Sequence, residues 1–229
     1  MDYEAVVFDL FGTLTPDVIE RDRVPMLTAM ADALEVPVDQ FRERWDAGSM
    51  DRMRGGSLAE HVAMACRDLG NTPAPQQVQE ALDRRLAWSR SYFFDTLQSI
   101  VQTVKVIREH KELRLALVSV CMEEVPGLWK ECPLAPYFDV TVFSCEVGLM
   151  KPDPGIYLLA SDGLGVPPEA CLYIGDGSFG ELHGAEEAGM TAALFRRPDQ
   201  DPDVHRPGER DDWTGEVISA IPEVLRLLC

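Results

Sequence analysis

Five polar residues follow short apolar segments of the sequence, and their chemistry suits hydrolysis of an anionic substrate. Asp9 ends the apolar segment at residues 4–9, and the others come after later segments of the same kind: Ser119, Lys151, Asp176 and Glu181. Carboxylates that converge repel one another, and a bound hard cation such as Mg²⁺ relieves that repulsion through oxygen ligands. With a cation present, one aspartate can attack phosphorus and form an aspartyl-phosphate that water later hydrolyses.

Ser119 and Lys151 would complete such a site. A hydroxyl and an ammonium group can hold the remaining phosphoryl oxygens, where charge must be stabilised in the transition state. Taken singly, each candidate residue also suits an ordinary turn or a solvated surface, where aspartate, serine and lysine are common. The functional interpretation depends on all of them occurring in order, each at or just beyond a predicted strand.

The elements that must position these residues are predicted to be parallel strands. Short apolar segments rich in β-branched and aromatic residues have the pattern of buried strands at residues 4–9, 113–120, 140–145, 170–175 and 190–195. Stretches with helical spacing alternate with them, near residues 97–108, 155–163 and 180–188. This alternation favours an α/β fold, with a Rossmann-like parallel sheet covered by helices on both faces. Ligands bind such sheets at the carboxyl ends of the strands, where the candidate residues fall.

A helical insertion is predicted between the first two strands. They are separated by roughly a hundred residues, far more than the dozen or so that a crossover requires. That interval contains helical spacing and no convincing strand, at residues 24–34, 39–50, 57–69 and 75–92. We therefore predict an all-helical cap domain at residues 15–94 within a core domain made of residues 1–14 and 95–229. Beyond the sheet, the composition predicts an exposed loop at residues 198–212 and a helix at 213–228.

Composition narrows the classes of function. The formal net charge of −18 would repel a phosphate polymer, so nucleic-acid binding is not expected. No apolar run reaches the length of a membrane span and the first residues lack a basic region, so a soluble, cytoplasmic protein without a membrane partner is predicted. The six cysteines form no Cys-x-x-Cys pair and are interpreted as small core residues. A monomer and a homodimer are both left open.

The order of these motifs resembles that of the haloacid dehalogenase-like (HAD) hydrolase superfamily, over essentially the whole chain. The four matching segments are Asp9-Leu-Phe-Gly-Thr-Leu, Leu117-Val-Ser, Lys151-Pro-Asp-Pro, and Gly175-Asp continuing to Glu181. The helical insertion after the first motif is similar to the C1-type cap of that superfamily.

The resemblance implies a role for each matching residue. Asp9 would be the nucleophile and a Mg²⁺ ligand, with the backbone carbonyl of Phe11 and Asp176 as further ligands and Glu181 holding metal-bound water. Ser119 and Lys151 would bind phosphoryl oxygens. The remaining expected substrate contacts are Gly12, Thr13 and Val120 beside these motifs, and Arg52 and Arg54 in the cap. The cap arginines precede a flexible glycine pair and have the fork that binds carboxylate or phosphate, although a solvated helix face would carry them equally well.

Two positions depart from the pattern of the superfamily's phosphatases. Those enzymes usually carry a second aspartate two residues after the nucleophile, as general acid and base, and here that position is Phe11. Such help is typically worth about 10²–10⁴-fold in rate. Asp17 and Asp51 are possible replacements by position alone. Val120 stands where an asparagine often follows the second motif.

Three functions therefore remain open. The preferred one is a Mg²⁺-dependent phosphatase of a small phosphorylated metabolite. The dehalogenase branch of the superfamily also lacks the second aspartate and works without metal, so a carbon–halogen hydrolase is the first alternative. A phosphometabolite-binding protein with weak catalysis, a consequence of Phe11, is the second.

Overall fold

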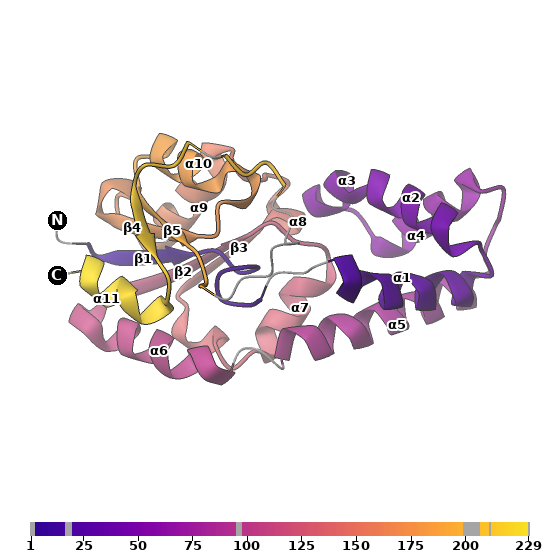
Figure 1. Cartoon of the computed structure of the whole chain (residues 1–229), viewed down its shortest axis with the longest axis horizontal. Coiled ribbons are helices and arrows are strands. Elements are labelled where there is room, and N and C mark those ends of the chain that lie inside the picture. The colour runs from indigo at the N-terminus through magenta and orange to yellow at the C-terminus, as the bar shows by residue number, and fades with distance from the viewer. Residues whose placement is uncertain (1–2, 17–19, 95–97, 199–206, 211, 229) are drawn as a thin grey trace.

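A computed structural model describes residues 3–16, 20–94, 98–198, 207–210 and 212–228. Its centre is a parallel sheet of six strands in the order β3-β2-β1-β4-β5-β6 (Figure 1). The strands are β1 (Ala5–Phe8), β2 (Arg114–Ser119), β3 (Val140–Phe143), β4 (Cys171–Gly175), β5 (Thr191–Phe195) and β6 (Glu216–Ile218). The predicted parallel α/β sheet is confirmed.

Alternate residues of the strands build two separate apolar layers. In β1, Val6 and Phe8 face one layer and Ala5 and Val7 face the other, and all four are fully buried. The first layer is covered by α6 (Gln98–Glu109), α7 (Glu124–Glu131) and α11 (Val224–Leu227). The second is covered by α9 (Pro154–Leu164) and α10 (Glu181–Glu187), on the opposite side of the sheet in Figure 1. Burial on both faces explains why these strands are nearly continuous apolar runs.

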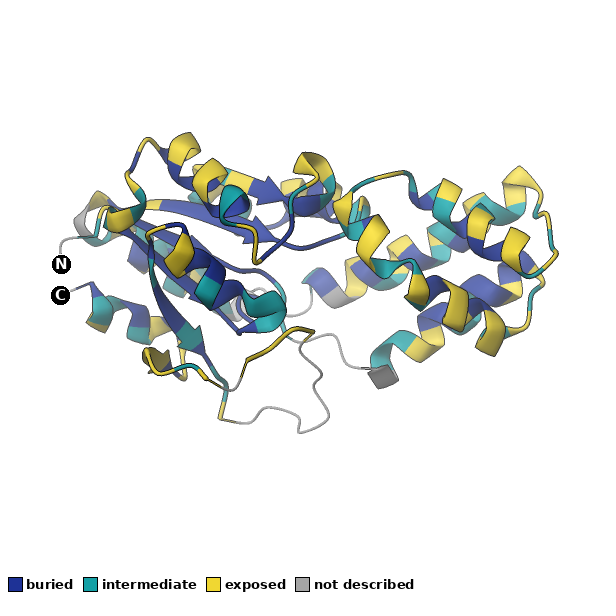
Figure 2. Ribbon diagram, turned by 90° about the horizontal axis from the view of Figure 1, so that it is seen from above, coloured by how far each residue is buried: buried dark blue, intermediate teal, exposed yellow. Residues whose placement is uncertain are grey.

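The described residues between β1 and β2 form helices rather than a second sheet. They include α1 (Glu20–Leu34), α2 (Val38–Ala47), α3 (Ser49–Arg54), α4 (Leu58–Asp68) and α5 (Pro75–Phe94). These five helices, called the helical unit below, have their own buried apolar cluster, which includes Leu27, Phe41, Trp45 and Val62. Figure 2 shows buried faces turned inward and exposed faces outward in this unit. The predicted domain boundaries at residues 14 and 94 stay predictions.

Most helix predictions agree with the structure, and one near Gly48 needs correction. The helix predicted at 39–50 is two helices, because α2 ends at Ala47 and α3 begins at Ser49, with Gly48 between them. Ser57 caps α4 as its position suggests, since its hydroxyl accepts a hydrogen bond from the N–H of Ala59 at 3.2 Å. The remaining short helices are η1 (His110–Glu112), η2 (Ala135–Tyr137), α8 (Ser144–Val147), η3 (Pro168–Ala170), η4 (Ser178–Gly180) and η5 (Ile221–Glu223). No helix among the described residues has the length and apolar character needed to cross a membrane.

The helix predicted at residues 213–228 is wrong in its first half. Residues 216–218 form the edge strand β6, which pairs with β5, and only η5 and α11 are helical. The spacing of Val217 and Ile221 imitates a helix, but Val217 is half-exposed whereas Ile218 is buried in the core. A strand of three residues is too short to show alternation, so the pairing with β5 decides its conformation.

The other predictions for this part of the chain have mixed outcomes. Most of the loop predicted at 198–212, and Cys229, lie outside the described residues. Four cysteines are core residues as predicted, namely Cys66, Cys121, Cys132 and Cys171. Cys145 is only half-buried, and its Sγ lies 3.8 Å from that of Cys121.

Neighbouring residues of β6 give a direct test of this strand. Ile218→Ala is expected to lower the free energy of unfolding by about 2–4 kcal/mol, because it removes a buried side chain from the core. Val217→Ala is expected to change it by less than about 0.5 kcal/mol, because that side chain faces solvent. Chemical denaturation of both variants measures the difference. Equal losses would contradict the assignment of 216–218 to a strand.

Candidate active site

Asp9 lies at the centre of the sheet, where the strand order changes direction. β1 is hydrogen-bonded to both β2 and β4, and the N–H of Asp9 donates to the carbonyl of Ile174 at 2.9 Å. The connections from β1 and from β4 therefore run to opposite edges of the sheet, which opens the crevice where α/β proteins bind ligands. Ser119 at the end of β2 and Asp176 after β4 flank Asp9 at the same edge.

Lys151 joins two carboxylates that come from different parts of the sequence. Its Nζ lies 2.5 Å from Oδ1 of Asp9 and 2.6 Å from Oε2 of Glu181. All three side chains are buried. Burying isolated charges is costly, whereas an ammonium group shared by two carboxylates satisfies all of them. The structure thus brings together three residues that the sequence analysis selected separately.

Two glycines allow this close approach. A Cβ at Gly184 in α10 would lie 2.3 Å from the carbonyl oxygen of Pro152, so only glycine lets α10 pack against the segment that carries Lys151. A Cβ at Gly175 would lie 2.2 Å from Oε1 of Glu181, so the end of β4 also has room for the Glu181 carboxylate only because it lacks a side chain.

Glu181 is fixed by residues that the sequence analysis missed. Tyr173 donates its hydroxyl proton to Oε2 at 2.6 Å, and the N–H of Gly177 donates to Oε1 at 2.9 Å. The hydroxyl of Tyr157 donates to the backbone carbonyl of Glu181 at 2.9 Å. A tyrosine inside an otherwise apolar strand is a usable signal, because a buried hydroxyl needs a polar partner.

Burial dominates the electrostatics of these groups. It raises the pKa of Asp9 and of Glu181. Repulsion from Asp176 adds to the rise at Asp9 and repulsion from Asp9 adds to the rise at Glu181, while the Lys151 ammonium opposes both. Burial alone would lower the pKa of Lys151, but the charges of Asp9 and Glu181 outweigh it and the net pKa is raised. Burial and the charge of Glu181 likewise raise the pKa of Tyr173, so that side chain stays a hydrogen-bond donor. Lys151 is therefore protonated and supplies the local positive charge.

Asp176 completes a cluster of acidic oxygens. It is buried, and both its carboxylate oxygens accept hydrogen bonds from Ser178, from the backbone N–H at 2.9 Å and from the hydroxyl at 3.0 Å. One oxygen from each of Asp9, Asp176 and Glu181 lies within 4.8 Å of the others. Three buried carboxylates at this distance, with only hard oxygen donors, fit the ligand preference of Mg²⁺.

Ser119 presents a hydroxyl at the sheet edge, next to the thiol of Cys121, and it partly offsets the rise that burial causes in the pKa of that thiol. It is fully buried at the end of β2, and its Oγ has no hydrogen-bond partner among the residues that the structure describes. Buried hydroxyls are normally hydrogen-bonded, so an unpaired one beside Asp9 is a candidate ligand contact. Val120 next to it is buried, and its predicted substrate contact stays a prediction.

The loop after Asp9 holds its carboxylate from the other side. The hydroxyl of Thr13 donates to Oδ2 of Asp9 at 2.9 Å, so Lys151 and Thr13 bind different oxygens. Gly12 has a φ of 82°, which the tight loop requires. Phe11 packs its ring against the apolar core, and the predicted roles of its carbonyl and of Gly12 stay predictions.

The two cap arginines differ sharply in their surroundings. Arg52 is buried in the helical unit, with its guanidinium 3.8 Å from the centre of the Trp45 ring, whereas Arg54 is exposed. Asp51, a possible acid by position, is exposed, and Asp17 lies outside the described residues. The substrate contacts predicted for both arginines stay predictions.

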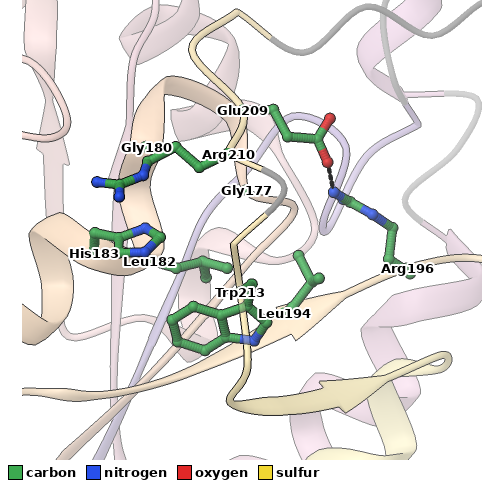
Figure 3. Close-up of a pocket in the computed structure, with 9 residues that line it drawn as sticks. All are labelled: Gly177, Gly180, Leu182, His183, Leu194, Arg196, Glu209, Arg210 and Trp213. Atoms are coloured by element: carbon green, nitrogen blue, oxygen red, sulfur yellow. Dashed lines mark hydrogen bonds and ion pairs between the residues drawn. The ribbon is translucent and has the colours of Figure 1, made fainter.

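A separate small pocket lies beyond Asp176 (Figure 3). Its lining includes Gly177, His183, Leu194 and Trp213, and Arg196 and Glu209 form an ion pair at its rim. The residues lining this pocket do not include Asp9, Ser119 or Lys151. His183, which the sequence analysis did not select, contacts the Trp213 ring, and its Nε2 lies 3.3 Å from Oδ1 of Asp212.

Comparison with known proteins decides the family. A family model of haloacid dehalogenase-like hydrolases matches residues 3–189, which include all the motif residues described above. The chain belongs to this hydrolase family. The resemblance stated from the motifs is therefore confirmed, and this HAD hydrolase has relatives with more than one chemistry.

Relatives of the HAD hydrolase include phosphatases and a dehalogenase. It is 27% identical to a protein named glyceraldehyde 3-phosphate phosphatase from Methanopyrus kandleri, over 97% of this chain and 99% of that one. It is 28% identical to a phosphoglycolate phosphatase from Shigella boydii, over 83% of this chain and 80% of that one. A solved 2-haloacid dehalogenase from Pseudomonas syringae has the same fold, with a TM-score of 0.71, 21% identity, and 99% and 98% of the two chains covered.

Replacing Lys151, whose ammonium group is shared by Asp9 and Glu181, tests the charge balance of this site. Lys151→Met is expected to lower the free energy of unfolding of the HAD hydrolase in EDTA by about 3 kcal/mol or more, because two buried carboxylates lose their partner. Lys105→Met is the control, since Lys105 is exposed and makes only a weak surface pair with Glu109, and it should change stability by less than about 0.5 kcal/mol. Urea denaturation measures both. Equal stability of the two variants would show that Lys151 does not balance these carboxylates.

Proposed function

We propose that this HAD hydrolase is a Mg²⁺-dependent phosphatase of a small phosphorylated metabolite, with Asp9 as the nucleophile. The observation that carries the proposal is the acidic cluster itself: Asp9, Asp176 and Glu181 offer buried oxygens within 4.8 Å of one another, and Lys151 contacts two of them. The names of the phosphatase relatives support the same substrate class.

The residues present fit a magnesium ion. Asp9 and Asp176 would hold it directly, with the carbonyl of Phe11, and Glu181 would hold a water molecule bound to it. When bound, Mg²⁺ neutralises the charge of the phosphoryl oxygens and of the nucleophile, which lets two anions approach each other. The carboxylate of Glu181 is held in place by hydrogen bonds from Tyr173, Gly177 and Lys151. It is therefore suited to bind a water molecule on the ion rather than the ion itself.

The chain's own residues perform the displacement. A carboxylate oxygen of Asp9 forms a bond to phosphorus while the bond from phosphorus to the leaving oxygen breaks, and the leaving oxygen takes a proton from solvent. Lys151 and the unpaired hydroxyl of Ser119 bind the phosphoryl oxygens on which negative charge is concentrated. Water then attacks the phosphorus of the aspartyl-phosphate, which releases inorganic phosphate and regenerates Asp9.

The alternative function is carbon–halogen hydrolysis, and the similarity in fold to a 2-haloacid dehalogenase supports it. That likeness is one of fold at 21% identity. Phe11 agrees with it, because the dehalogenase branch also lacks the second aspartate. The buried Asp9, Asp176 and Glu181 favour the phosphatase, because three carboxylates at one point suit a cation and repel a halocarboxylate. A protein that binds phosphometabolites without turnover is the remaining candidate, since Phe11 cannot transfer protons.

A paired assay separates these functions. We expect phosphate release from a panel of phosphate monoesters to require Mg²⁺, to stop in EDTA, and to fall by at least about 10³-fold in Asp9→Asn, which removes the nucleophile. Halide release from 2-haloacids is measured in parallel. Halide release that persists in EDTA would replace the phosphatase by the dehalogenase. Absence of both activities, with a melting temperature raised by phosphometabolites, would favour the binding protein.

Phe11 generates a second prediction, about the leaving group. Without a general acid near the leaving oxygen, p-nitrophenyl phosphate should be hydrolysed with a kcat/KM at least about 10²-fold above that for alkyl phosphates, because nitrophenolate leaves without a proton. Phe11→Asp should narrow that gap by raising the rate on alkyl phosphates. Steady-state kinetics on both ester classes measures it. Equal rates in the wild type would mean that another residue supplies the proton.

A further inference from the structure

Arg52 is a buried cation, and two of its nitrogens have no hydrogen-bond acceptor among the described residues. Its side chain lies in α3, 2% exposed, and its Nε and Nη2 have no hydrogen-bond partner among the described residues. The guanidinium lies 3.8 Å from the centre of the Trp45 ring, a contact that attracts the charge but uses none of its N–H groups. Burial and the neighbouring Arg85 lower the pKa of Arg52 to about 10. A buried guanidinium without an anion is unfavourable, so binding of an anionic group would stabilise Arg52 at this position.

The charges around Arg52 do not balance. The charged groups that act most strongly on Arg52 are Arg85, Asp46, Arg23 and Glu124. Arg85 forms a buried ion pair with Glu124, and Arg23 pairs with Asp46. Each of these two carboxylates therefore pairs with another guanidinium, and Arg52 forms no ion pair with either, although Oε2 of Glu124 also has no hydrogen-bond partner among the described residues. Among these five groups the positive charges exceed the negative ones by one.

The two nitrogens of Arg52 without a hydrogen-bond acceptor indicate which anionic group would fit this position. Nε and Nη2 form one edge of the guanidinium, and their N–H bonds run parallel, which matches the two oxygens of a carboxylate. The third nitrogen, Nη1, is directed at the backbone near Gly48, where a Cβ would come within 2.9 Å of it. A single excess positive charge is balanced by a carboxylate, whereas a phosphate would bring about two negative charges.

This cluster lies where the helical unit meets the sheet. Glu124 begins α7, five residues after Ser119, and Arg85 also contacts Sδ of Met122 at 3.1 Å. α3 packs against α8, beside β3, and a Cβ at Gly55 would lie 3.0 Å from the carbonyl oxygen of Cys145 (Figure 1). Arg52 is therefore held by helices that contact the segments following β2 and β3. The first of these segments begins directly after Ser119, and the second leads to Lys151.

We propose that Arg52 binds a carboxylate on the leaving group of the substrate, so that this HAD hydrolase acts on phosphate monoesters of hydroxy acids. Arg85 and Trp45 position Arg52, and Glu124 keeps Arg85 from competing for the ligand. This inference rests on the proposed phosphatase activity and adds the class of substrate. It requires the helical unit to open for entry, because Arg52 is buried in the closed structure.

The first test compares matched substrates with the wild-type enzyme and Mg²⁺. The pairs are 3-phosphoglycerate with glycerol 3-phosphate and phosphoglycolate with 2-hydroxyethyl phosphate, which differ only in a carboxylate replaced by a hydroxymethyl group. We expect kcat/KM to be higher for the acid by about 10–100-fold in the better-hydrolysed pair, the effect of a charge-assisted bidentate contact. Equal values of kcat/KM, or a higher value for the ester without a carboxylate, would overturn the proposal without any variant being made.

The second test changes Arg52. Arg52→Met should reduce kcat/KM for the carboxylate-bearing ester by about 10–100-fold, mainly through KM. For the ester without a carboxylate, kcat/KM should stay within about threefold of the wild-type value. Arg52→Lys keeps the charge but not the fork, so an intermediate loss for the acid alone is expected. Arg67→Met in α4 is the control, because Arg67 is exposed. An equal loss on both esters in Arg52→Met and Arg52→Lys would mean that Arg52 only maintains the fold.

A binding measurement separates failure of this inference from failure of the phosphatase proposal. In Asp9→Asn, 3-phosphoglycerate should raise the melting temperature more than glycerol 3-phosphate, and the additional Arg52→Met substitution should abolish that difference. If no phosphate monoester is hydrolysed but this difference is present, the phosphatase proposal fails and the carboxylate site stands. If phosphate is released without preference for acids and the difference is absent, the phosphatase stands and the carboxylate site is wrong.

Discussion

The arrangement of this molecule depends on one ammonium group placed between two buried carboxylates. Lys151 contacts both Asp9 and Glu181, and without it the centre of the sheet edge would hold like charges removed from water. Several features serve this contact: the glycine at 184 that admits Pro152, the glycine at 175 that admits Glu181, and the Tyr173 hydroxyl that orients the Glu181 carboxylate. The same contact keeps Asp9 in place between Lys151 and Thr13, where a nucleophile must be held.

The sheet and the helical unit divide the work of recognition. The sheet edge supplies acidic oxygens and one cation, which suit a phosphoryl group and a metal ion and would be much alike for many phosphate esters. The helical unit supplies a differently built environment, in which the guanidinium groups of Arg52 and Arg85 lie over the Trp45 ring and Arg85 pairs with Glu124 of α7. Under the function proposed above, bond breaking would take place at the rigid sheet edge and the choice of substrate would depend on the helical unit.

The sequence predicted the parts of this structure that depend on local pattern, and missed those that depend on distant packing. Asp9 and Asp176 could be placed because buried strands are recognisable apolar runs and their carboxyl ends share one edge. The pairing of 216–218 with β5 could not, because three residues carry no periodicity. Nor could the burial of Arg52, since an arginine on a short helix looks solvated until Trp45 and Arg85 are known to surround it.

The central claim is that Asp9 attacks phosphorus, and trapping the covalent intermediate tests it most directly. The wild-type enzyme is mixed with Mg²⁺ and a phosphate monoester that it hydrolyses, quenched in acid within milliseconds, and digested for mass spectrometry. The account predicts a phosphoryl group on the peptide that contains Asp9, absent when the substrate is omitted and removed by hydroxylamine, which cleaves acyl phosphates. Turnover without any phosphoryl group on Asp9, or with the group on another residue, would contradict it.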